Sequence, residues 1–154
     1  MITSVLCYIE KNGKTLMLHR VKKENDVHKG KWNGLGGKIE PNESPEEAIK
    51  REVFEESGLK IKKPILKGIL HYPETNNGAG EWIVFVFIAK KFTGKLIECN
   101  EGKLEWIPTK ELLKLKMWQG DYLFLPLLKK KGVFTGKIVY DKDEIVEKKF
   151  NYYN

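Results

Sequence analysis

The chain has 154 residues, 41% of them hydrophobic, a length that suits one domain with its own core. No stretch approaches the roughly 18 apolar residues of a membrane span, and the N-terminus lacks the basic start and long apolar run of a secretory signal. Cys7 and Cys99 are too few for a disulfide framework. We therefore expect one cytoplasmic domain over residues 1–154 with no membrane partner, and its net charge of +7 favours anionic partners such as nucleotides.

The first quarter of the chain reads as a hairpin followed by a loop. Residues 3–10 and 14–20 have the apolar, β-branched composition of strands. Asn12 and Gly13 between them tolerate positive φ, which favours a tight turn. Residues 21–38 are rich in Gly, Asn and Lys and are predicted to form a loop that ends in WNGLGGK.

The rest of the chain alternates apolar segments with turn-rich ones, which predicts an α/β sandwich. Pro126 interrupts the last helical segment, so it either bends that helix or marks its true start. The expected elements are strands over 61–72, 81–91 and 103–107, a flexible loop over 73–80 (PETNNGAG), a helix over 119–130, and a hairpin of 136–140 with 144–150 across 141–143.

A helix over 45–57 has the clearest boundaries. Ser44 suits the N-cap, and Glu47 completes a capping box with it. Pro45 suits the first helical position, and Gly58 suits the left-handed residue that ends a helix.

Three glutamates of this helix, Glu52, Glu55 and Glu56, lie at i, i+3 and i+4. At about 100° per residue they share one face, where like charges repel by roughly 0.2–0.5 kcal/mol per pair. Glu55 and Glu56 also lie in the last turn, where the helix dipole disfavours anions. A divalent cation such as Mg²⁺ or Mn²⁺, which takes oxygen ligands, would explain the cluster. On the helix alone, a solvated acidic face remains the alternative.

The residues around the helix decide between these interpretations. From Gly37 the chain reads Gly, five residues, Glu43, seven residues, Arg51-Glu52-Val53, one residue, Glu55-Glu56, one residue, Gly58-Leu59. This pattern matches by chance on the order of 10⁻⁹ per start position, given average residue frequencies. The chain thereby resembles the Nudix hydrolase family, whose members share an α/β/α sandwich with a mixed central sheet and cleave nucleoside diphosphates linked to another group.

Carried over by position in the motif, the resemblance implies that Glu52, Glu55 and Glu56 are the catalytic residues and ligands of Mg²⁺, for which Mn²⁺ can substitute. It adds the Gly36 carbonyl and the acid Glu101 to the metal site. Water would attack a bridging phosphorus with a glutamate as base, and the motif does not say which of the three it is.

Other parts of the motif have a supporting role. Glu43 can reach Arg51, and we expect this pair to orient the helix against the preceding loop. Gly37 and the glycine before it let the backbone turn tightly and approach a phosphate or a metal. Basic side chains such as Arg20 and Lys38 would stabilise charge on the phosphoryl oxygens.

The resemblance extends to the MutT-like branch, through KGKWNGLGGKIEPNE and MWQGDYLFLPLLKKKGVFTGKIVY. Members of that branch hydrolyse oxidised purine nucleoside triphosphates to the monophosphate and pyrophosphate. By this resemblance we expect 8-oxo-dGTP to be the chief substrate of this chain. By this resemblance Trp118 would stack on the purine, as its polar neighbourhood also suggests. Asn33 and Asp121 would bind the guanine edge, and Thr3 would lie at the floor of the pocket. The expected substrate-binding residues are Thr3, Arg20, Asn33, Leu35, Gly36, Gly37, Lys38, Trp118 and Asp121.

One position departs from the branch. Two adjacent acids follow the tryptophan in the animal members, and they are tied to recognition of both oxidised guanine and oxidised adenine. Here the first position is Gly120 and only Asp121 is acidic. We therefore expect oxidised adenine forms to be poorer substrates.

Two further hypotheses remain. One is an RNA 5′ pyrophosphohydrolase, or a hydrolase of another nucleoside diphosphate; the positive charge permits RNA, but no platform of aromatic and basic residues is evident. The other is a catalytically inactive nucleotide-binding module, against which the three retained glutamates argue. We expect a nucleoside triphosphate as substrate, no stable nucleic-acid complex, and a monomer or homodimer.

Overall fold

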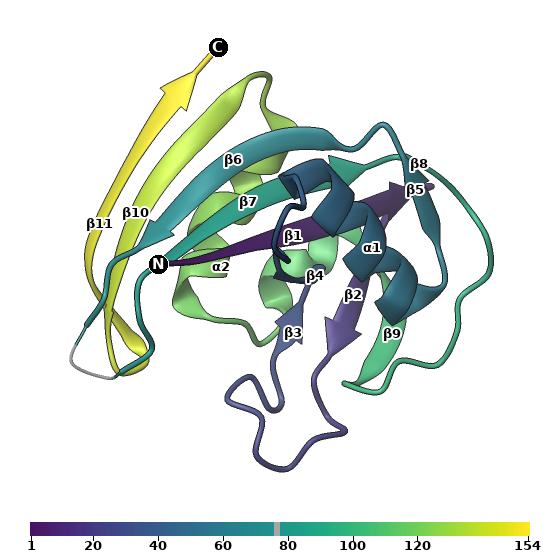
Figure 1. The fold of residues 1–154 in the computed structure, drawn as a ribbon, viewed down its shortest axis with the longest axis horizontal. Coiled ribbons are helices and arrows are strands. Elements are labelled where there is room, and N and C mark those ends of the chain that lie inside the picture. The colour runs from purple at the N-terminus through teal and green to yellow at the C-terminus, as the bar shows by residue number, and fades with distance from the viewer. Residues whose placement is uncertain (76–77) are drawn as a thin grey trace.

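The computed structural model describes residues 1–75 and 78–154. A mixed nine-stranded sheet forms its centre, in the order β11-β10-β6-β7-β1-β2-β3, with β4 pairing with β1 and β9 with β2 (Figure 1). Strands β1 and β7 run parallel, as do β6 and β10. The strands are β1 (Ile2–Lys11), β2 (Lys14–His19), β3 (Trp32–Asn33), β4 (Leu35–Lys38), β5 (Lys60–Lys62), β6 (Ile65–Tyr72), β7 (Trp82–Ala89), β8 (Lys91–Thr93), β9 (Lys103–Pro108), β10 (Val133–Asp141) and β11 (Glu144–Tyr153).

Helices cover both faces of this sheet (Figure 1). They are α1 (Pro45–Ser57), α2 (Gln119–Phe124) and the 3-10 helices η1 (Thr109–Lys114) and η2 (Leu125–Lys129). Alternate residues of β1 pack against the helices on the two faces of the sheet, because successive side chains of a strand point to opposite faces. Val5 and Cys7 pack in a core with α1, whereas Tyr8 packs in a second core with α2 and η2. The predicted α/β/α sandwich with a mixed sheet is confirmed.

Several predicted elements are confirmed. Asn12 and Gly13 have positive φ, as the hairpin of β1 and β2 requires. The capping box on α1 is formed: Ser44 Oγ accepts from the Glu47 N–H at 3.1 Å, and Glu47 accepts from the Ser44 N–H at 2.9 Å. Gly58 ends the helix at φ 79°. The segment 103–107 lies in β9, and the C-terminal hairpin is β10 with β11, longer than predicted.

Other predictions need correction. The loop predicted over 21–38 ends in two strands, because β3 and β4 pair with β2 and β1, a long-range contact that local composition hides. The strand predicted over 61–72 is divided at Lys63, whose φ of 50° interrupts it before Pro64. The helix predicted over 119–130 ends at Phe124, and a 3-10 helix containing Pro126 follows.

The strand predicted over 81–91 ends at Ala89, and β8 and η1 were not predicted. The loop predicted over 73–80 includes residues 76–77, which lie outside the described residues. Within the described residues, no helix is long and apolar enough to cross a membrane.

Candidate active site

The acidic face of α1 lies directly against β4. A Cβ on Gly37 would lie 2.5 Å from the carboxyl group of Glu52. Any residue other than glycine at this position would therefore displace that carboxyl group. A Cβ on Gly36 would lie 1.9 Å from the carbonyl oxygen of Val5 in β1. The two glycines therefore have different tasks: Gly36 permits the pairing of β4 with β1, and Gly37 permits the approach of the helix.

Glu56 is the acid most enclosed by the protein. Its Oε1 accepts a hydrogen bond of 2.8 Å from the backbone N–H of Gly36. Burial raises its pKa well above the ordinary value of 4.5, and the neighbouring acid Glu101 raises it further. Burial also raises the pKa of Glu52, with the charges of Glu55 and Glu101 adding to the effect. The structure thus brings together the glutamates of α1 and Glu101, although Glu101 lies far from them in sequence.

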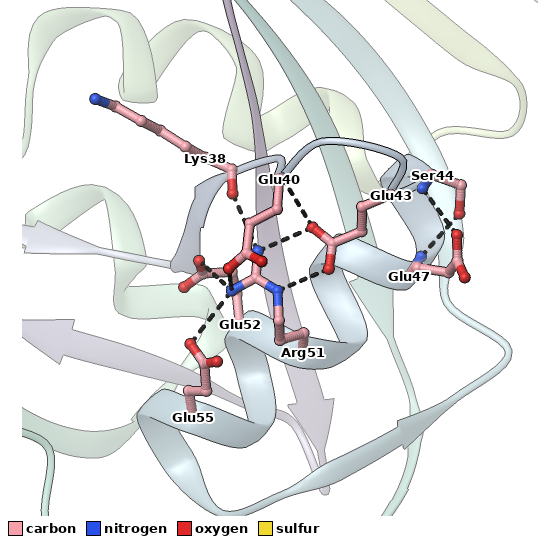
Figure 2. A network of polar contacts seen from close by, with 8 residues as sticks. All are labelled: Lys38, Glu40, Glu43, Ser44, Glu47, Arg51, Glu52 and Glu55. Atoms are coloured by element: carbon pink, nitrogen blue, oxygen red, sulfur yellow. Dashed lines mark hydrogen bonds and ion pairs between the residues drawn. The ribbon is translucent and has the colours of Figure 1, made fainter.

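Arg51 is the centre of a network that ties α1 to the loop before it (Figure 2). Its Nε and Nη2 bind the two carboxyl oxygens of Glu43 at 2.7 and 2.9 Å, and Nη2 also donates to the Lys38 carbonyl at 3.1 Å. This bidentate contact lowers the pKa of Glu43 to about 2. Nη1 binds Glu52 at 2.9 Å and Glu55 at 3.3 Å. The geometry fits the positioning role predicted for Glu43 and Arg51.

The acids of this site have the chemistry that a hard divalent cation requires. They offer carboxylate oxygens, and two of them have pKa values raised by burial and like charge, which a cation would relieve. In the present side-chain arrangement Glu55 turns toward Arg51, and its side chain is 57% exposed. Within the described residues, no group of three His, Cys, Asp or Glu side chains is assembled to hold a metal ion as it stands. For Glu55 to join Glu52 and Glu56 around a cation, as predicted, it would have to leave Arg51.

The basic side chains predicted to bind phosphate, Arg20 and Lys38, contact other residues of the protein. Arg20 Nε pairs with Asp26 at 2.7 Å, and its Nη1 lies 3.5 Å from Glu101. The side chain of Lys38 extends away from the acids in Figure 2. Its Nζ lies 5.7 Å from the ring centre of Trp82.

Of the residues predicted to bind the base, Trp118 lies in a group of aromatic and basic side chains at the start of α2. Trp118 donates from Nε1 to Nδ1 of His28 at 2.7 Å and contacts Tyr140 edge to face, with ring centres 5.9 Å apart. Lys31 Nζ lies 4.3 Å from the Trp118 ring centre. Asp121 is only 8% exposed, and burial raises its pKa to about 7.

Asn33 has an unusual feature for a buried polar side chain. Its Oδ1 is buried and has no hydrogen-bond partner among the described residues. Such atoms are uncommon in folded proteins and are often completed by a water or a ligand. This observation agrees with a binding role for Asn33.

Two predicted substrate-binding residues are placed differently from the expectation. Leu35 is fully buried in the core beneath α1, so its side chain packs and does not reach a ligand. Thr3 is exposed and points to the α1 side of β1, because it shares that face with Val5. Ser4 points to the α2 side with Tyr8 and is 6% exposed. The period-two pattern of β1 could have identified Ser4, and not Thr3, as the hydroxyl-bearing residue on the α2 side of the sheet.

Sequence comparison places the chain among known proteins. A family model described as the NUDIX domain matches residues 2–128. This chain belongs to the Nudix family. It therefore is a hydrolase of pyrophosphate bonds in nucleotide substrates.

Individual relatives share most of its length. The Nudix hydrolase YvcI of Bacillus subtilis is 32% identical over 138 residues, covering 87% of this chain and 84% of YvcI. An "oxidized purine nucleoside triphosphate hydrolase" of Danio rerio is 34% identical over 124 residues, covering 79% and 78% of the two chains. The crystal structure of a mutator MutT protein from Bacillus halodurans has a TM-score of 0.88 at 30% identity and covers 98% of both chains. The Nudix fold and the MutT-like resemblance are thus confirmed.

Proposed function

We propose that this Nudix hydrolase degrades oxidised purine nucleoside triphosphates, chiefly 8-oxo-dGTP, to the monophosphate and pyrophosphate. The observation that carries the proposal is the buried acid Asp121, which lies three residues after Trp118 and can accept hydrogen bonds from a base. Among the described residues Asp121 has a backbone hydrogen bond with Trp118 but no cationic partner, and burial raises its pKa to about 7. A base that donates to it would stabilise its charged form, and guanine offers two donors, N1–H and the 2-amino group. The relative from Danio rerio is named for the same substrate class.

The glutamates of α1 supply the hydrolytic part of the site. Mg²⁺, when bound, supplies positive charge next to the phosphate oxygens. Glu52, Glu55 and Glu56 would hold it together with Glu101 and the Gly36 carbonyl. The Gly36 N–H fixes one oxygen of Glu56, so its other oxygen is left for a cation or a proton.

The same residues orient the reaction. Arg51 holds Glu52 in place through a contact of 2.9 Å, and one of the glutamates accepts the proton of the attacking water. Arg20 lies next to Glu101, where its charge can also act on a phosphate. Lys38 is free to swing from Trp82 toward the phosphates, because a single cation–π contact at an exposed site is worth only about 0.5–1 kcal/mol.

The decisive experiment is a substrate panel with product identification. Purified protein with Mg²⁺ is incubated with 8-oxo-dGTP, dGTP, 2-oxo-dATP, 5′-triphosphate RNA and ADP-ribose. We expect the highest kcat/KM for 8-oxo-dGTP, with pyrophosphate as product, and no turnover with chelator. A preference for RNA or ADP-ribose would support the second hypothesis, and nucleotide binding without any turnover would support the inactive module.

Asp121→Ala tests the base-recognition part of the proposal. A hydrogen bond to a charged group is worth about 1.5–3 kcal/mol, so kcat/KM for 8-oxo-dGTP should fall roughly 10- to 150-fold. Turnover of ADP-ribose, where detectable, serves as the control, because it does not need a guanine edge. Equal kcat/KM values for the three deoxynucleotides, or an unaffected Asp121→Ala variant, would contradict the assignment.

A further inference from the structure

Tyr140 of β10 lies beside Asp121 in a position that the hydrolytic site does not use. Its hydroxyl oxygen accepts a hydrogen bond of 2.7 Å from the backbone N–H of Gly120. Its ring stacks on Tyr72, with ring centres 6.2 Å apart and an interplanar angle of 23°, and meets Trp118 edge to face at 79°. The phenol is therefore fixed at both ends, by its ring and by its oxygen.

The hydroxyl group of Tyr140 fills the space that a side chain at position 120 would need. A Cβ on Gly120 would lie 2.9 Å from this oxygen and 3.1 Å from Cδ1 of Ile138. Any larger residue at 120 would have to displace the phenol. Position 120, where the animal members of the branch have an acid, is a glycine in this chain. The hydroxyl group of Tyr140 reaches the same place from β10.

The hydroxyl proton of Tyr140 is available for a further hydrogen bond. A tyrosine hydroxyl has one proton to donate, and the bond from Gly120 occupies only the oxygen. Within the residues that the structure describes, no acceptor is assigned to that proton. Burial and the nearby charge of Asp121 raise the pKa of Tyr140 to about 12, so the phenol keeps its proton at neutral pH.

We propose that Tyr140 is a specificity-determining residue, whose hydroxyl donates a hydrogen bond to the substrate base next to the carboxylate of Asp121, which accepts one. A donor beside an acceptor is complementary to the edge of a 6-oxopurine, which presents O6 as acceptor and N1–H as donor. A 6-aminopurine presents a donor and an acceptor in the reverse order. The pair would therefore select 6-oxopurines, and this inference rests on the proposed function.

Tyr140→Phe tests the inference, because it keeps the ring contacts and removes only the hydroxyl. The substrates are dITP and dATP, which differ only at the 6-position and N1. The ratio of their kcat/KM values should fall about 3- to 10-fold in the variant, the size expected for one hydrogen bond. Tyr72→Phe is the matched control, since it removes a phenol from the same stack that also lies near Asp121 but, among the described residues, has no hydrogen bond to α2; its ratio should stay unchanged.

Gly120→Ala provides a second variant in the same position. Its methyl group should push the hydroxyl aside and lower the dITP to dATP ratio by a similar factor. In the Tyr140→Phe background the same change should lower the ratio much less, because the oxygen that it displaces is gone. A melting temperature for each variant separates this effect from general destabilisation.

The outcomes are distinct. A wild-type protein that hydrolyses no purine nucleoside triphosphate overturns the proposed function itself. Wild-type turnover with an unchanged ratio in Tyr140→Phe overturns the role of Tyr140 and leaves the proposed function standing. An equal fall for both substrates, or an equal fall of the ratio in Tyr72→Phe, also overturns it, since either shows a structural effect.

Discussion

Glu56, one of the acids proposed to hold the metal, should weaken the fold that carries it. Its pKa is raised by burial and by Glu101, so the metal-free protein should lose stability as the pH rises above the ordinary 4.5 of a glutamate. In Glu56→Gln this loss should become smaller, with Glu52 and Asp121 supplying what remains, and the melting temperature in chelator at pH 8 should exceed that of the wild type by several degrees. Turnover should fall at least roughly 10²-fold.

Glu55→Gln is the matched control for this prediction. Its side chain is 57% exposed and pairs with Arg51, so its loss should change stability by no more than about 0.5 kcal/mol. Turnover should still fall at least roughly 10²-fold if Glu55 leaves Arg51 to bind the cation. Melting curves against pH and initial rates with Mg²⁺ measure both effects, and normal turnover of both variants would show that α1 is not the metal site.

Asp121 adds a dependence on pH that the sequence did not indicate. We expected Asp121 to bind the guanine edge, and burial raises its pKa to about 7, so its charge changes near neutral pH. Below that pH it is mostly protonated, so it loses the negative charge that strengthens a bond from a guanine N1–H and gains an O–H donor that suits N1 of a 6-aminopurine. The ratio of kcat/KM for 8-oxo-dGTP to that for 8-oxo-dATP should therefore rise about tenfold from pH 6 to pH 8. The ratio cancels ionisations that both substrates share, and it should be flat in Asp121→Asn; a flat wild-type profile would contradict the prediction.

At the scale of elements, Gly36 and Gly37 should respond differently to the same added methyl group. In Gly36→Ala the Cβ meets the backbone of β1 at 1.9 Å, which cannot yield without breaking the pairing of β4. This variant should be strongly destabilised or insoluble. In Gly37→Ala the Cβ meets the carboxyl end of Glu52, which can rotate away. That variant should fold with a melting temperature near the wild type but lose most of its turnover, as circular dichroism and rate measurements would show.

The elements also show what the sequence could and could not predict. Helix α1 was predicted with its caps because its signals are local: Ser44, Glu47 and Gly58 act within one or two turns. Strands β3 and β4 were missed because their pairing with β2 and β1 is not encoded in the glycine-rich segment that forms them. The acids predicted to bind the metal follow from a spaced motif, and the face of Ser4 follows from the pleat of β1, but the place of Tyr140 depends on contacts between distant strands. Such contacts leave no local signature.

At the scale of the whole molecule, the chain beyond the family match is part of the core. The match ends at residue 128, yet Phe134 and Ile138 of β10 are fully buried. The ring of Phe134 lies over Gly68 of β6, where a Cβ would come within 2.1 Å of it. β10 also pairs with the edge of β6 and carries Tyr140 to Gly120, next to Asp121.

A truncated chain that ends at Lys130 should therefore fail to fold cooperatively. Loss of a single buried Phe usually costs about 3–5 kcal/mol, and this truncation removes Phe134 and Ile138 together and exposes the edge of β6. We expect aggregation in size-exclusion chromatography and no cooperative thermal transition. A chain that ends at Asn151 is the control, because it removes only Tyr152, Tyr153 and Asn154, all of which are exposed, and it should melt close to the full-length protein. A soluble, cooperatively folded chain ending at Lys130 would instead mean that the C-terminal hairpin is an appendage and that the domain ends where the family match does.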